Sequence, residues 1–195
     1  MKKLVARSAL AVVVLTVALG LVLPIVFTGF ARVVFPNKSN GSLIERSGQV
    51  VGSKLVAQGF TSPRYFHERP SGTSPAYNAA ATTFANLGPT NPDLAKNIRA
   101  AALAILKLER PYNPGLRIGD IPVDAVTTSG SGVDPDITPA YAKLQAARIA
   151  AVRGLSRDRV DQLVSQNTDG RSLGFLGEPG VNVLKLNLAL DKEKA

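Results

Sequence analysis

The sequence predicts an α+β protein, in which a single N-terminal transmembrane helix precedes one mixed α/β soluble domain. The first observation behind this prediction is an uncharged apolar run over residues 8–31. The second is that helix signals and strand signals interleave along residues 32–195 without a regular strand–helix alternation, which favours α+β over a parallel α/β fold. These remaining residues are enough for one domain of ordinary size with its own core.

The apolar run is long enough to cross a membrane as a helix. About 20 apolar residues span the hydrocarbon core of a bilayer, and lipid offers the backbone no hydrogen-bond partners, so such a segment must be helical. Pro24 lies within the run and would kink the helix without preventing it from spanning. The chain contains no second run of this kind, which predicts a single-pass protein.

The charges before the run predict its orientation. Lys2, Lys3 and Arg7 precede it and no acidic residue does, and basic residues stay preferentially on the cytoplasmic side. We therefore expect, in the cell inner membrane, a cytoplasmic tail (1–7), a transmembrane helix (8–31) and an extracytoplasmic soluble domain (32–195). A cleaved secretory signal is the alternative, because small residues around Gly20 offer a cleavage spacing. Signal cores usually contain about 7–15 apolar residues, and this run is longer.

Three helices have clear start and stop signals. The first is capped by Asn91, and its apolar residues recur at helical spacing: Leu94, Ile98, Ala101, Ile105 and Leu108. The second begins after Thr138 and ends at Gly154, and the third is capped by Ser156 and closed by Gly170.

Strand character is found in three segments, over residues 49–60, 121–128 and 181–190, and the first could instead be two short strands broken at Gly52. The last segment places leucines at alternate positions, which predicts a strand that finishes in a short helix from Asn187. Residues 61–92 are rich in Pro, Gly, Ser, Thr and Asn, which predicts irregular backbone. Their aromatic side chains indicate a loop that packs on a core or is held by a partner.

Composition excludes several kinds of chemistry. The chain has no cysteine and only one histidine, His67, so thiol catalysis is excluded and no metal site is expected. The net charge is +9, but no arginine-rich run, zinc-finger spacing or stacking motif indicates a nucleic-acid partner. The densest basic group is predicted to be a solvated helix face, with a patch for phosphate or an acidic partner as the alternative: Arg148, Arg153, Arg157 and Arg159.

Residues 126–139 (VTTSGSGVDPDITP) form a Ser/Gly-rich loop before the second helix. Such a loop can present backbone N–H groups to an anion. The loop has neither the lysine of a P-loop nor the G-x-G-x-x-G pattern, and Asp134 and Asp136 would repel phosphate unless a cation intervened. The alternative is a structural turn whose glycines permit positive φ.

Segment 65–71 (YFHERPS) places an imidazole, a carboxylate and a guanidinium within three residues. Ser71 or Ser131 could pair with His67 and Asp134 as a triad, which makes a membrane-anchored extracytoplasmic hydrolase an alternative function. The chain contains no G-x-S-x-G elbow, and only geometry defines a triad. We therefore expect this segment to pack or dock, as part of a subunit or of a stand-alone binding module.

Several motifs occur together in one order along the chain: NGSLI (40–44), QGF (58–60), YFHERPS (65–71), NLGPTNPDL (86–94), PVDAVTTSGSGVDPDITP (122–139), GEP (177–179) and VNVL with LNLALD (181–191). In this combination the sequence resembles the KdpC family, the C subunits of bacterial Kdp potassium-transporting P-type ATPases. The resemblance covers almost the whole chain. It implies a non-catalytic accessory subunit of an ATP-driven, high-affinity potassium uptake complex.

The resemblance also implies partners and a nucleotide role. The partners would be a channel-like potassium-translocating subunit (KdpA), the P-type ATPase subunit (KdpB), a small single-span subunit (KdpF) and the lipid bilayer. The C subunit would act in assembly and as a catalytic chaperone that raises the ATP affinity of the ATPase subunit. No cofactor would bind tightly, and ATP would be contacted only in a transient complex through Ser129, Gly130, Ser131, Gly132 and Gln145.

This nucleotide role conflicts with the predicted orientation, because ATP is cytoplasmic and the Ser/Gly loop is expected outside. The orientation favours an outward cap on the channel-like subunit, with intramembrane packing through Gly20 and Gly29. Aromatic and arginine side chains dominate binding energy at interfaces. The predicted docking surface therefore contains Tyr65, Phe66, His67, Arg69, Tyr77 and Phe84.

Overall fold

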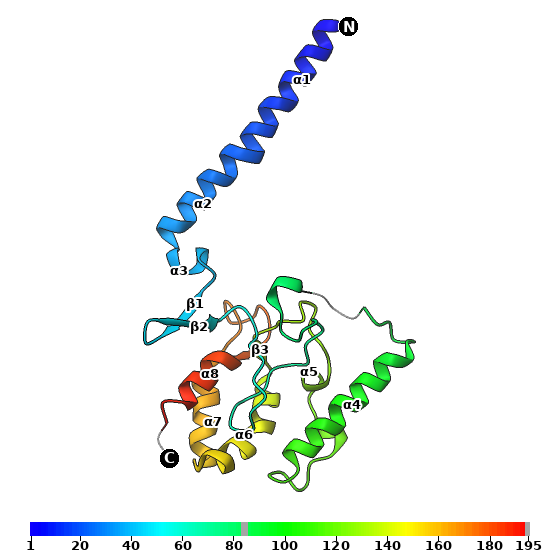
Figure 1. The fold of residues 1–195 in the computed structure, drawn as a ribbon, viewed down its shortest axis with the longest axis vertical. Coiled ribbons are helices and arrows are strands. Elements are labelled where there is room, and N and C mark those ends of the chain that lie inside the picture. Colours follow the sequence, from blue (N-terminus) through cyan, green and yellow to red (C-terminus); the bar gives the residue numbers. More distant parts are fainter. Residues whose placement is uncertain (83–85, 194–195) are drawn as a thin grey trace. The chain divides into compact units, whose positions relative to one another are not determined.

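The computed structural model describes residues 1–82 and 86–193 and divides into two compact units, Met1–Val51 and Gly52–Ala195 (Figure 1). The first unit contains a long apolar helix. The second contains several helices and a small antiparallel sheet, so the predicted α+β class with an N-terminal apolar helix is confirmed. Phe84, one of the predicted docking residues, lies outside the described residues.

The long helix covers Lys2–Val34 and is long and apolar enough to cross a membrane. It consists of α1 (Lys2–Val17), a π-helical stretch η1 (Ala18–Val22) and α2 (Leu23–Val34), and the single turn α3 (Pro36–Ser39) follows it. None of its residues is buried. The π-helical stretch ends two residues before Pro24, whose ring would clash with the carbonyl four residues earlier in an α-helix.

A hairpin follows the helix and connects β1 (Leu43–Arg46) to β2 (Gln49–Ser53). Its two turn residues, Ser47 and Gly48, have φ values of 53° and 77°. Positive φ at both positions is the signature of the type I′ turn, which suits the twist of a two-residue hairpin. The predicted strand over 49–60 is therefore correct only as far as Ser53.

The second unit contains a three-stranded antiparallel sheet in the order β3-β5-β4. The strands are β3 (Asp136–Ile137), β4 (Thr168–Asp169) and β5 (Gly180–Asn182). Val181 of the central strand lies opposite Ile137 on one side and Thr168 on the other, and it is fully buried. Because the strands are so short, helices provide most of the core.

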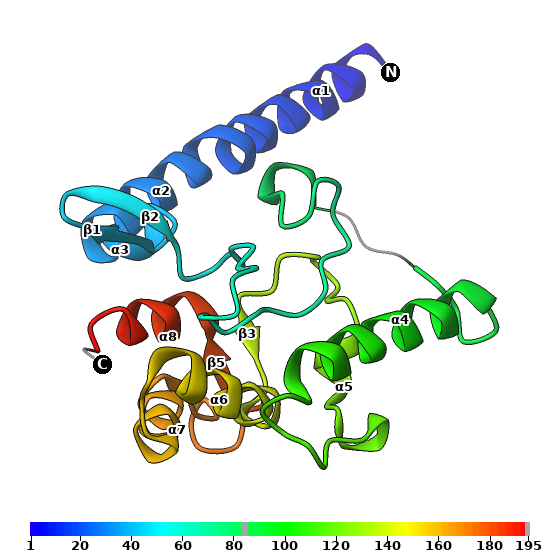
Figure 2. The same ribbon diagram turned by 60° about the horizontal axis from the view of Figure 1, so that its bottom comes forward.

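Three helices gather around this sheet: α6 (Pro139–Arg153), α7 (Arg157–Gln166) and α8 (Val183–Leu190). Figure 2 shows α4 (Pro92–Glu109) beside the short α5 (Val123–Val126), and α4 also contacts α6. Two 3-10 turns, η2 (Ala79–Ala81) and η3 (Ile118–Asp120), complete the elements of the described residues.

The predicted helix starts are confirmed by side-chain caps. Asn91 accepts a hydrogen bond from the Asp93 amide, Thr138 from Tyr141 and Ser156 from Arg159. The predicted end of α6 is also correct, because Gly154 adopts the left-handed conformation with φ 68°.

Three predicted boundaries are wrong. Within residues 121–128, Val123–Val126 form the helical turn α5 instead of a strand, and the Thr127 hydroxyl donates to the Val123 carbonyl at 2.8 Å. Helix α7 ends at Gln166, before Gly170, and β4 follows it. Helix α8 begins at Val183, not Asn187, because Asn182 caps it by accepting from the Lys185 amide at 3.2 Å.

The core of the second unit is built around α6. Its alanines 142 and 146 are fully buried, as are Ile149 of the same helix and Val160 of α7. Small side chains allow neighbouring segments to approach the helix backbone closely. Phe66, from the irregular segment that precedes α4, is also fully buried in this cluster.

Candidate functional site

Segment 65–71 is bound by two buried amide side chains. Gln145 of α6 accepts a hydrogen bond from the His67 amide at 2.8 Å and donates to the His67 carbonyl at 3.0 Å. Asn187 of α8 makes the same pair of bonds to Phe66, at 2.8 and 3.0 Å. Both amides are 1% exposed. They satisfy the buried backbone as a neighbouring strand would, so the segment is fixed between two helices.

Arg148 extends this network at the centre of the domain. It is fully buried, and its Nε donates to the Glu109 carboxylate at 2.8 Å. Its guanidinium also donates to the carbonyls of Pro63 and Tyr65 and to Gln145 Oε1. Burial raises the pKa of the Glu109 carboxyl, and the charge of Arg148 opposes this rise.

The other arginines of the predicted basic group also have partners within the fold. Arg153 donates to the Leu190 carbonyl at 3.1 Å and to Asp191 at 3.0 Å, and its guanidinium lies 4.8 Å from the centre of the Tyr65 ring. Arg157 pairs with Asp161, and Arg159 pairs with Glu193. A solvated face or free basic patch is therefore the wrong interpretation for Arg148 and Arg153, which link segments of the domain.

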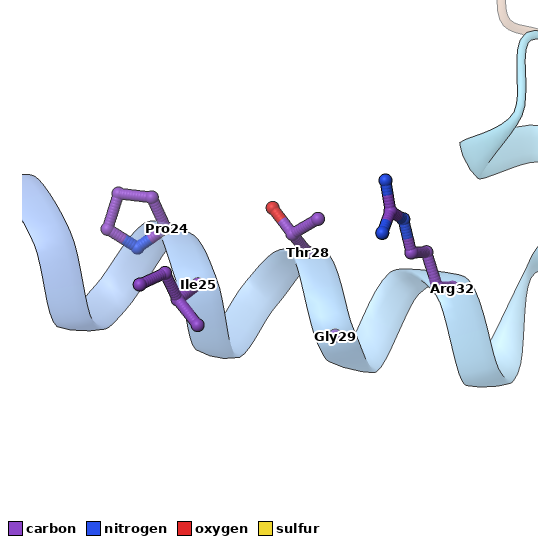
Figure 3. Close-up of a pocket in the computed structure, with 5 residues that line it drawn as sticks. All are labelled: Pro24, Ile25, Thr28, Gly29 and Arg32. Carbon is purple, nitrogen blue, oxygen red and sulfur yellow. The ribbon is translucent and has the colours of Figure 1, made fainter.

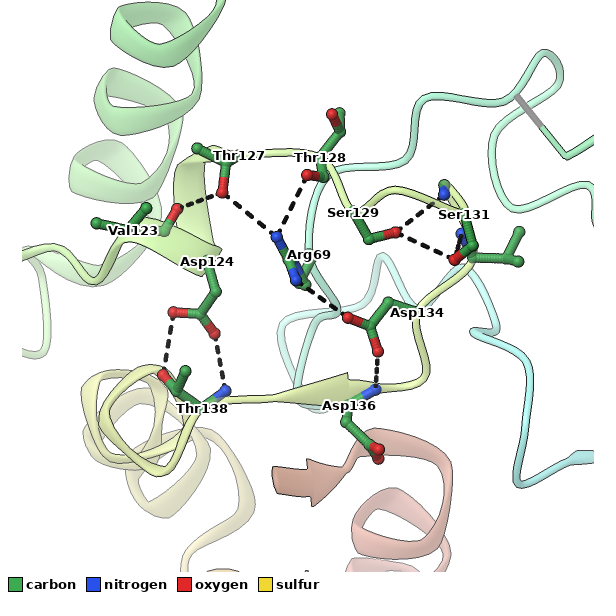
Figure 4. Close-up of polar contacts among 12 residues, drawn as sticks. Arg69, Val123, Asp124, Thr127, Thr128, Ser129, Ser131, Asp134, Asp136 and Thr138 are labelled. Atoms are coloured by element: carbon green, nitrogen blue, oxygen red, sulfur yellow. Dashed lines mark hydrogen bonds and ion pairs between the residues drawn. The ribbon is translucent and has the colours of Figure 1, made fainter. Parts of the chain in front are cut away.

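The Ser/Gly loop is held closed by its own serines (Figure 4). The Ser129 hydroxyl accepts from the Gly132 amide at 2.9 Å, and the Ser131 hydroxyl accepts from the Val133 amide at 3.2 Å. The carbonyl of Gly132, which has φ 72°, accepts from the Ser71 hydroxyl at 2.7 Å. Two amides that could bind an anion are thus already used within the loop, as expected of a structural turn.

Arg69 holds this loop from the side of segment 65–71. Its guanidinium donates to Asp134 at 3.0 Å and to the Thr128 carbonyl at 3.2 Å (Figure 4). The Asp124 carboxylate accepts hydrogen bonds from the amide and the hydroxyl of Thr138, at 2.8 and 3.0 Å. These bonds fix the start of α6. These contacts join the loop, α5 and α6 into one unit.

A recess of about 210 Å³ lies beside the loop, and its ionisable lining is mostly acidic. One arginine, Arg69, faces four carboxyl groups: Asp124, Asp134, Asp136 and Glu178. Burial is the largest cause that raises the pKa of Asp136. Excess negative charge disfavours a triphosphate there. Among residues 1–82 and 86–193, no three His, Asp or Glu side chains converge as a metal site.

The predicted nucleotide residues have separate partners within the fold. Gln145 is bonded to His67 and Arg148, whereas the Ser/Gly loop is bonded to Ser71. The triad considered as an alternative is not assembled. The His67 Nε2 atom lies 2.9 Å from the Ser62 carbonyl, while Asp134 pairs with Arg69.

The predicted docking residues mostly face inward. Phe66 is fully buried, and the Tyr65 hydroxyl donates to Asp191 at 3.0 Å. The Tyr77 hydroxyl donates to the Arg69 carbonyl at 3.0 Å, and its ring lies against Gly59, where an added Cβ would approach it to 2.9 Å. These side chains organise the domain, and Phe66 is not available to a partner in this structure.

A second recess, of about 370 Å³, was not predicted from the sequence. It lies between segment 65–71 and α4, and Glu68 and Tyr141 contribute to its lining. Glu68 is 4% exposed and accepts from the amides of Gln58 and Phe60 at 3.2 and 3.4 Å. Burial raises its pKa to about 7. Burial and the nearby Glu68 also raise the pKa of Tyr77 to about 12, and burial lowers the pKa of His67.

The sequence reasoning also missed an exposed apolar loop over residues 171–178, which we call the tip loop. Leu173, Phe175 and Leu176 are 83%, 69% and 49% exposed. Two hydrogen bonds of 2.9 Å between the backbones of Ser172 and Leu176 close the loop, and Arg171 pairs with Glu178 at 2.6 Å. The loop therefore presents three large apolar side chains on a bonded frame. The available signal was the run Leu-Gly-Phe-Leu-Gly, which no predicted element accounted for.

Among the described residues, one helix is long and apolar enough to cross a membrane, and a small, internally cross-linked α+β domain follows it. Residues 5–192 match the family of the K+-transporting ATPase c chain, KdpC. The potassium-transporting ATPase KdpC subunit of Methylococcus capsulatus is 51% identical over 185 residues, which cover 94% of this chain and 95% of that protein. The KdpC subunit of Burkholderia orbicola (strain MC0-3) is 50% identical over 200 residues, with 100% and 99% covered. The KdpC subunit of Koribacter versatilis is 47% identical over 191 residues, which cover 98% of this chain and 95% of that protein. The chain belongs to the KdpC family of potassium-transporting ATPase subunits, and the resemblance inferred from its motifs is confirmed.

Proposed function

We propose that this protein is a non-catalytic accessory subunit of an ATP-driven potassium uptake complex, anchored by its span with the domain outside the cytoplasm. One observation carries the non-catalytic part of this proposal. Gln145 and Ser129, which were predicted to contact a nucleotide, are both bonded within the fold. A side chain used in this way stabilises the domain and has no free group to offer to a substrate.

The partners of this subunit are, in our proposal, the channel-like subunit KdpA, the ATPase subunit KdpB and the small subunit KdpF. The relatives are named as subunits of a potassium-transporting ATPase, which supports a complex of this kind. The subunit stabilises the assembly and thereby supports ATP hydrolysis by the ATPase subunit. Lys2, Lys3 and Arg7 support a cytoplasmic N-terminus in the inner membrane.

The tip loop is the better-supported docking surface of the domain, because the aromatic segment 65–77 faces inward. We propose that Phe175 and Leu173 enter an apolar pocket on the outer side of the channel-like subunit. Phenylalanine is enriched in the cores of protein interfaces. The ion pair between Arg171 and Glu178 leaves the base of the loop without net charge. This disfavours attachment to anionic lipid, which attracts basic segments.

Direct ATP binding by this subunit is the alternative proposal, and it has weaker support. Contact through Gln145 would require opening the core, and contact at the Ser/Gly loop would place a triphosphate beside four carboxyl groups. An effect on the ATP affinity of the ATPase subunit is better explained by transmission through the assembled complex.

The test compares purified complexes with and without this subunit. We expect the complex without it to lose integrity and potassium-stimulated ATP hydrolysis, while the isolated subunit neither binds nor hydrolyses ATP. ATP binding by the isolated subunit in a calorimetric titration would favour the nucleotide alternative. An isolated subunit that cleaves esters or peptides would contradict the accessory role altogether.

A further inference from the structure

The span contains a break in its backbone hydrogen bonding next to Pro24. The Leu23 amide donates to the Ala18 carbonyl, five residues back, which marks the π-helical stretch. In an α-helix the same amide would bind the carbonyl of Leu19, and position 24 would bind that of Gly20. Position 24 is a proline and has no N–H. The carbonyls of Leu19 and Gly20 therefore both lose the donor that an α-helix supplies.

No side chain nearby replaces these donors. Residues 17–27 (VALGLVLPIVF) contain no hydroxyl, amide or charged group, and the nearest hydroxyls belong to Thr16 and Thr28. A helical threonine reaches the carbonyl three or four residues before it. Thr16 thus reaches positions 12 and 13, and Thr28 reaches positions 24 and 25. Neither reaches the carbonyls of Leu19 and Gly20.

These two carbonyls lie at the centre of the uncharged run 8–31, where a membrane offers no water. An unsatisfied backbone group there costs several kcal/mol, and helix breaks at proline persist where neighbouring helices, Ser/Thr side chains, ordered waters or local π-helical adjustments supply the missing bonds. The π-helical stretch gives the Ala18 carbonyl a donor, whereas the next amide position, which would serve the Leu19 carbonyl in the same register, is Pro24. Gly20 has no side chain, and beyond its chain neighbours and the nearby backbone of its own helix nothing lies within 4 Å of where its Cβ would be. A second helix can therefore approach the backbone closely at this point.

The side of the helix that carries Gly20 continues with Pro24 and with two polar side chains, those of Thr28 and Arg32. Pro24, Thr28 and Arg32 follow Gly20 at intervals of four residues and project from one side of the helix (Figure 3). With Ile25 and Gly29 they line a shallow notch of about 350 Å³. A face with a glycine, a notch and a hydroxyl suits a neighbouring helix better than lipid chains.

We propose that a transmembrane helix of a partner subunit packs on the face formed by Gly20, Pro24 and Thr28. That helix donates a side-chain hydrogen bond, from a hydroxyl or amide group, to the carbonyl of Leu19 or Gly20. The inference rests on the proposed function, because it requires assembly within a membrane complex. It adds the face of the span that is used and the chemistry of the partner side chain.

Carbonyl NMR of the intact complex in lipid tests the hydrogen bond. Labelling this chain with 13C-carbonyl glycine and 15N-leucine selects three Gly–Leu pairs, at residues 20–21, 115–116 and 154–155. A Leu21→Ile variant removes and thereby assigns the first signal. We expect the Gly20 carbonyl signal, or that of Leu19 from Leu–Gly labelling, to move downfield when partner subunits join the chain. Identical signals with and without the partners, for both carbonyls, would overturn the inference.

A Pro24→Ala variant tests the contribution of this bond to assembly. Position 24 regains its amide, so the Gly20 carbonyl bonds within its own helix and the partner donor loses its acceptor. We expect association about threefold to tenfold weaker, as for one hydrogen bond between membrane helices. Val26→Ala is the matched control, because Val26 lies two positions from Pro24, on the other side of the helix.

The outcomes separate the inference from the proposed function. If the unchanged chain does not assemble with potassium-transporting subunits, the proposed function fails. If the unchanged chain assembles and Pro24→Ala assembles equally well or better, the proposed function stands and the inference is wrong. Weaker association of Pro24→Ala, with Val26→Ala unchanged, supports both.

Discussion

The helix Lys2–Val34 and the domain that follows it differ in how they bury residues and satisfy their polar groups. The helix buries none of its own residues and leaves two central carbonyls without their helical donors. The domain buries even charged and amide side chains and bonds most of their polar atoms internally, as Arg148 and Gln145 show. The difference teaches that the domain completes its own structure, whereas the helix depends on a surrounding membrane and partners.

The largest expected effect tests the self-sufficiency of the domain at Arg148. An Arg148→Ala variant leaves Glu109 buried without its counter-charge and removes the donors to the segment around Tyr65. We expect a loss of about 3–5 kcal/mol in the free energy of unfolding of the full chain in detergent, followed by circular dichroism. Arg157→Ala is the control, because its ion pair is largely exposed and contributes about 1 kcal/mol or less. Equal losses from both variants would contradict the account.

The next effect concerns the buried carboxyl of Glu68. Its pKa is about 7 in the folded domain and 4.5 in the unfolded chain, so between these pH values the folded state binds more protons. Stability should therefore fall as the pH rises from about 4.5 to about 7, by at most about 3 kcal/mol. The measurement is the difference in unfolding free energy between the unchanged chain and Glu68→Gln across this range. A constant difference would show that Glu68 titrates normally.

A smaller loss is expected from Gln145→Ala. The substitution leaves the amide and carbonyl of His67 without their partners, which should cost about 2–3 kcal/mol in unfolding free energy. If Gln145 serves a nucleotide instead of the fold, the variant will unfold like the unchanged chain and only ATP-dependent activity of the complex will change. Thermal unfolding and ATP hydrolysis measured side by side distinguish these roles.

The smallest effect on folding is expected at the tip loop. Phe175 is 69% exposed, so Phe175→Ala should leave the unfolding free energy within about 0.5 kcal/mol of its original value. Co-purification with the channel-like subunit should nevertheless fall, because an aromatic anchor at an interface contributes about 2 kcal/mol or more. Ile118→Ala, at a site 55% exposed, is the matched control. Equal co-purification of both variants would remove the tip loop as a docking surface.

Local signals predicted much of this fold, and long-range contacts decided the rest. The caps Asn91, Thr138 and Ser156 lie next to the helices they start, so the sequence was sufficient for them. The strand predicted over 121–128 failed because the Thr127 hydroxyl closes a helical turn on the Val123 carbonyl and the Asp124 carboxylate binds the distant Thr138 amide. Apolar periodicity records neither contact.

The candidate site shows the same limit more clearly. Residue type and motif marked Phe66, Gln145 and Arg148 as notable, and each proved to be fully or almost fully buried. Their partners lie far away in the sequence: Gln145 is 78 residues from His67, and Asn187 is 121 residues from Phe66. Whether an amide serves a ligand or a distant backbone cannot be read from its neighbours in the chain.

The side of the membrane on which the domain lies is the central claim, and it can be measured directly. The chain has no cysteine, so single substitutions report on their own positions. Lys96→Cys lies on the exposed side of α4, and Ala6→Cys precedes the uncharged run. In intact cells, an impermeant thiol reagent should label position 96 and leave position 6 unlabelled until the cells are opened. Labelling at position 6, with position 96 protected until the cells are opened, would place the domain in the cytoplasm and contradict the account.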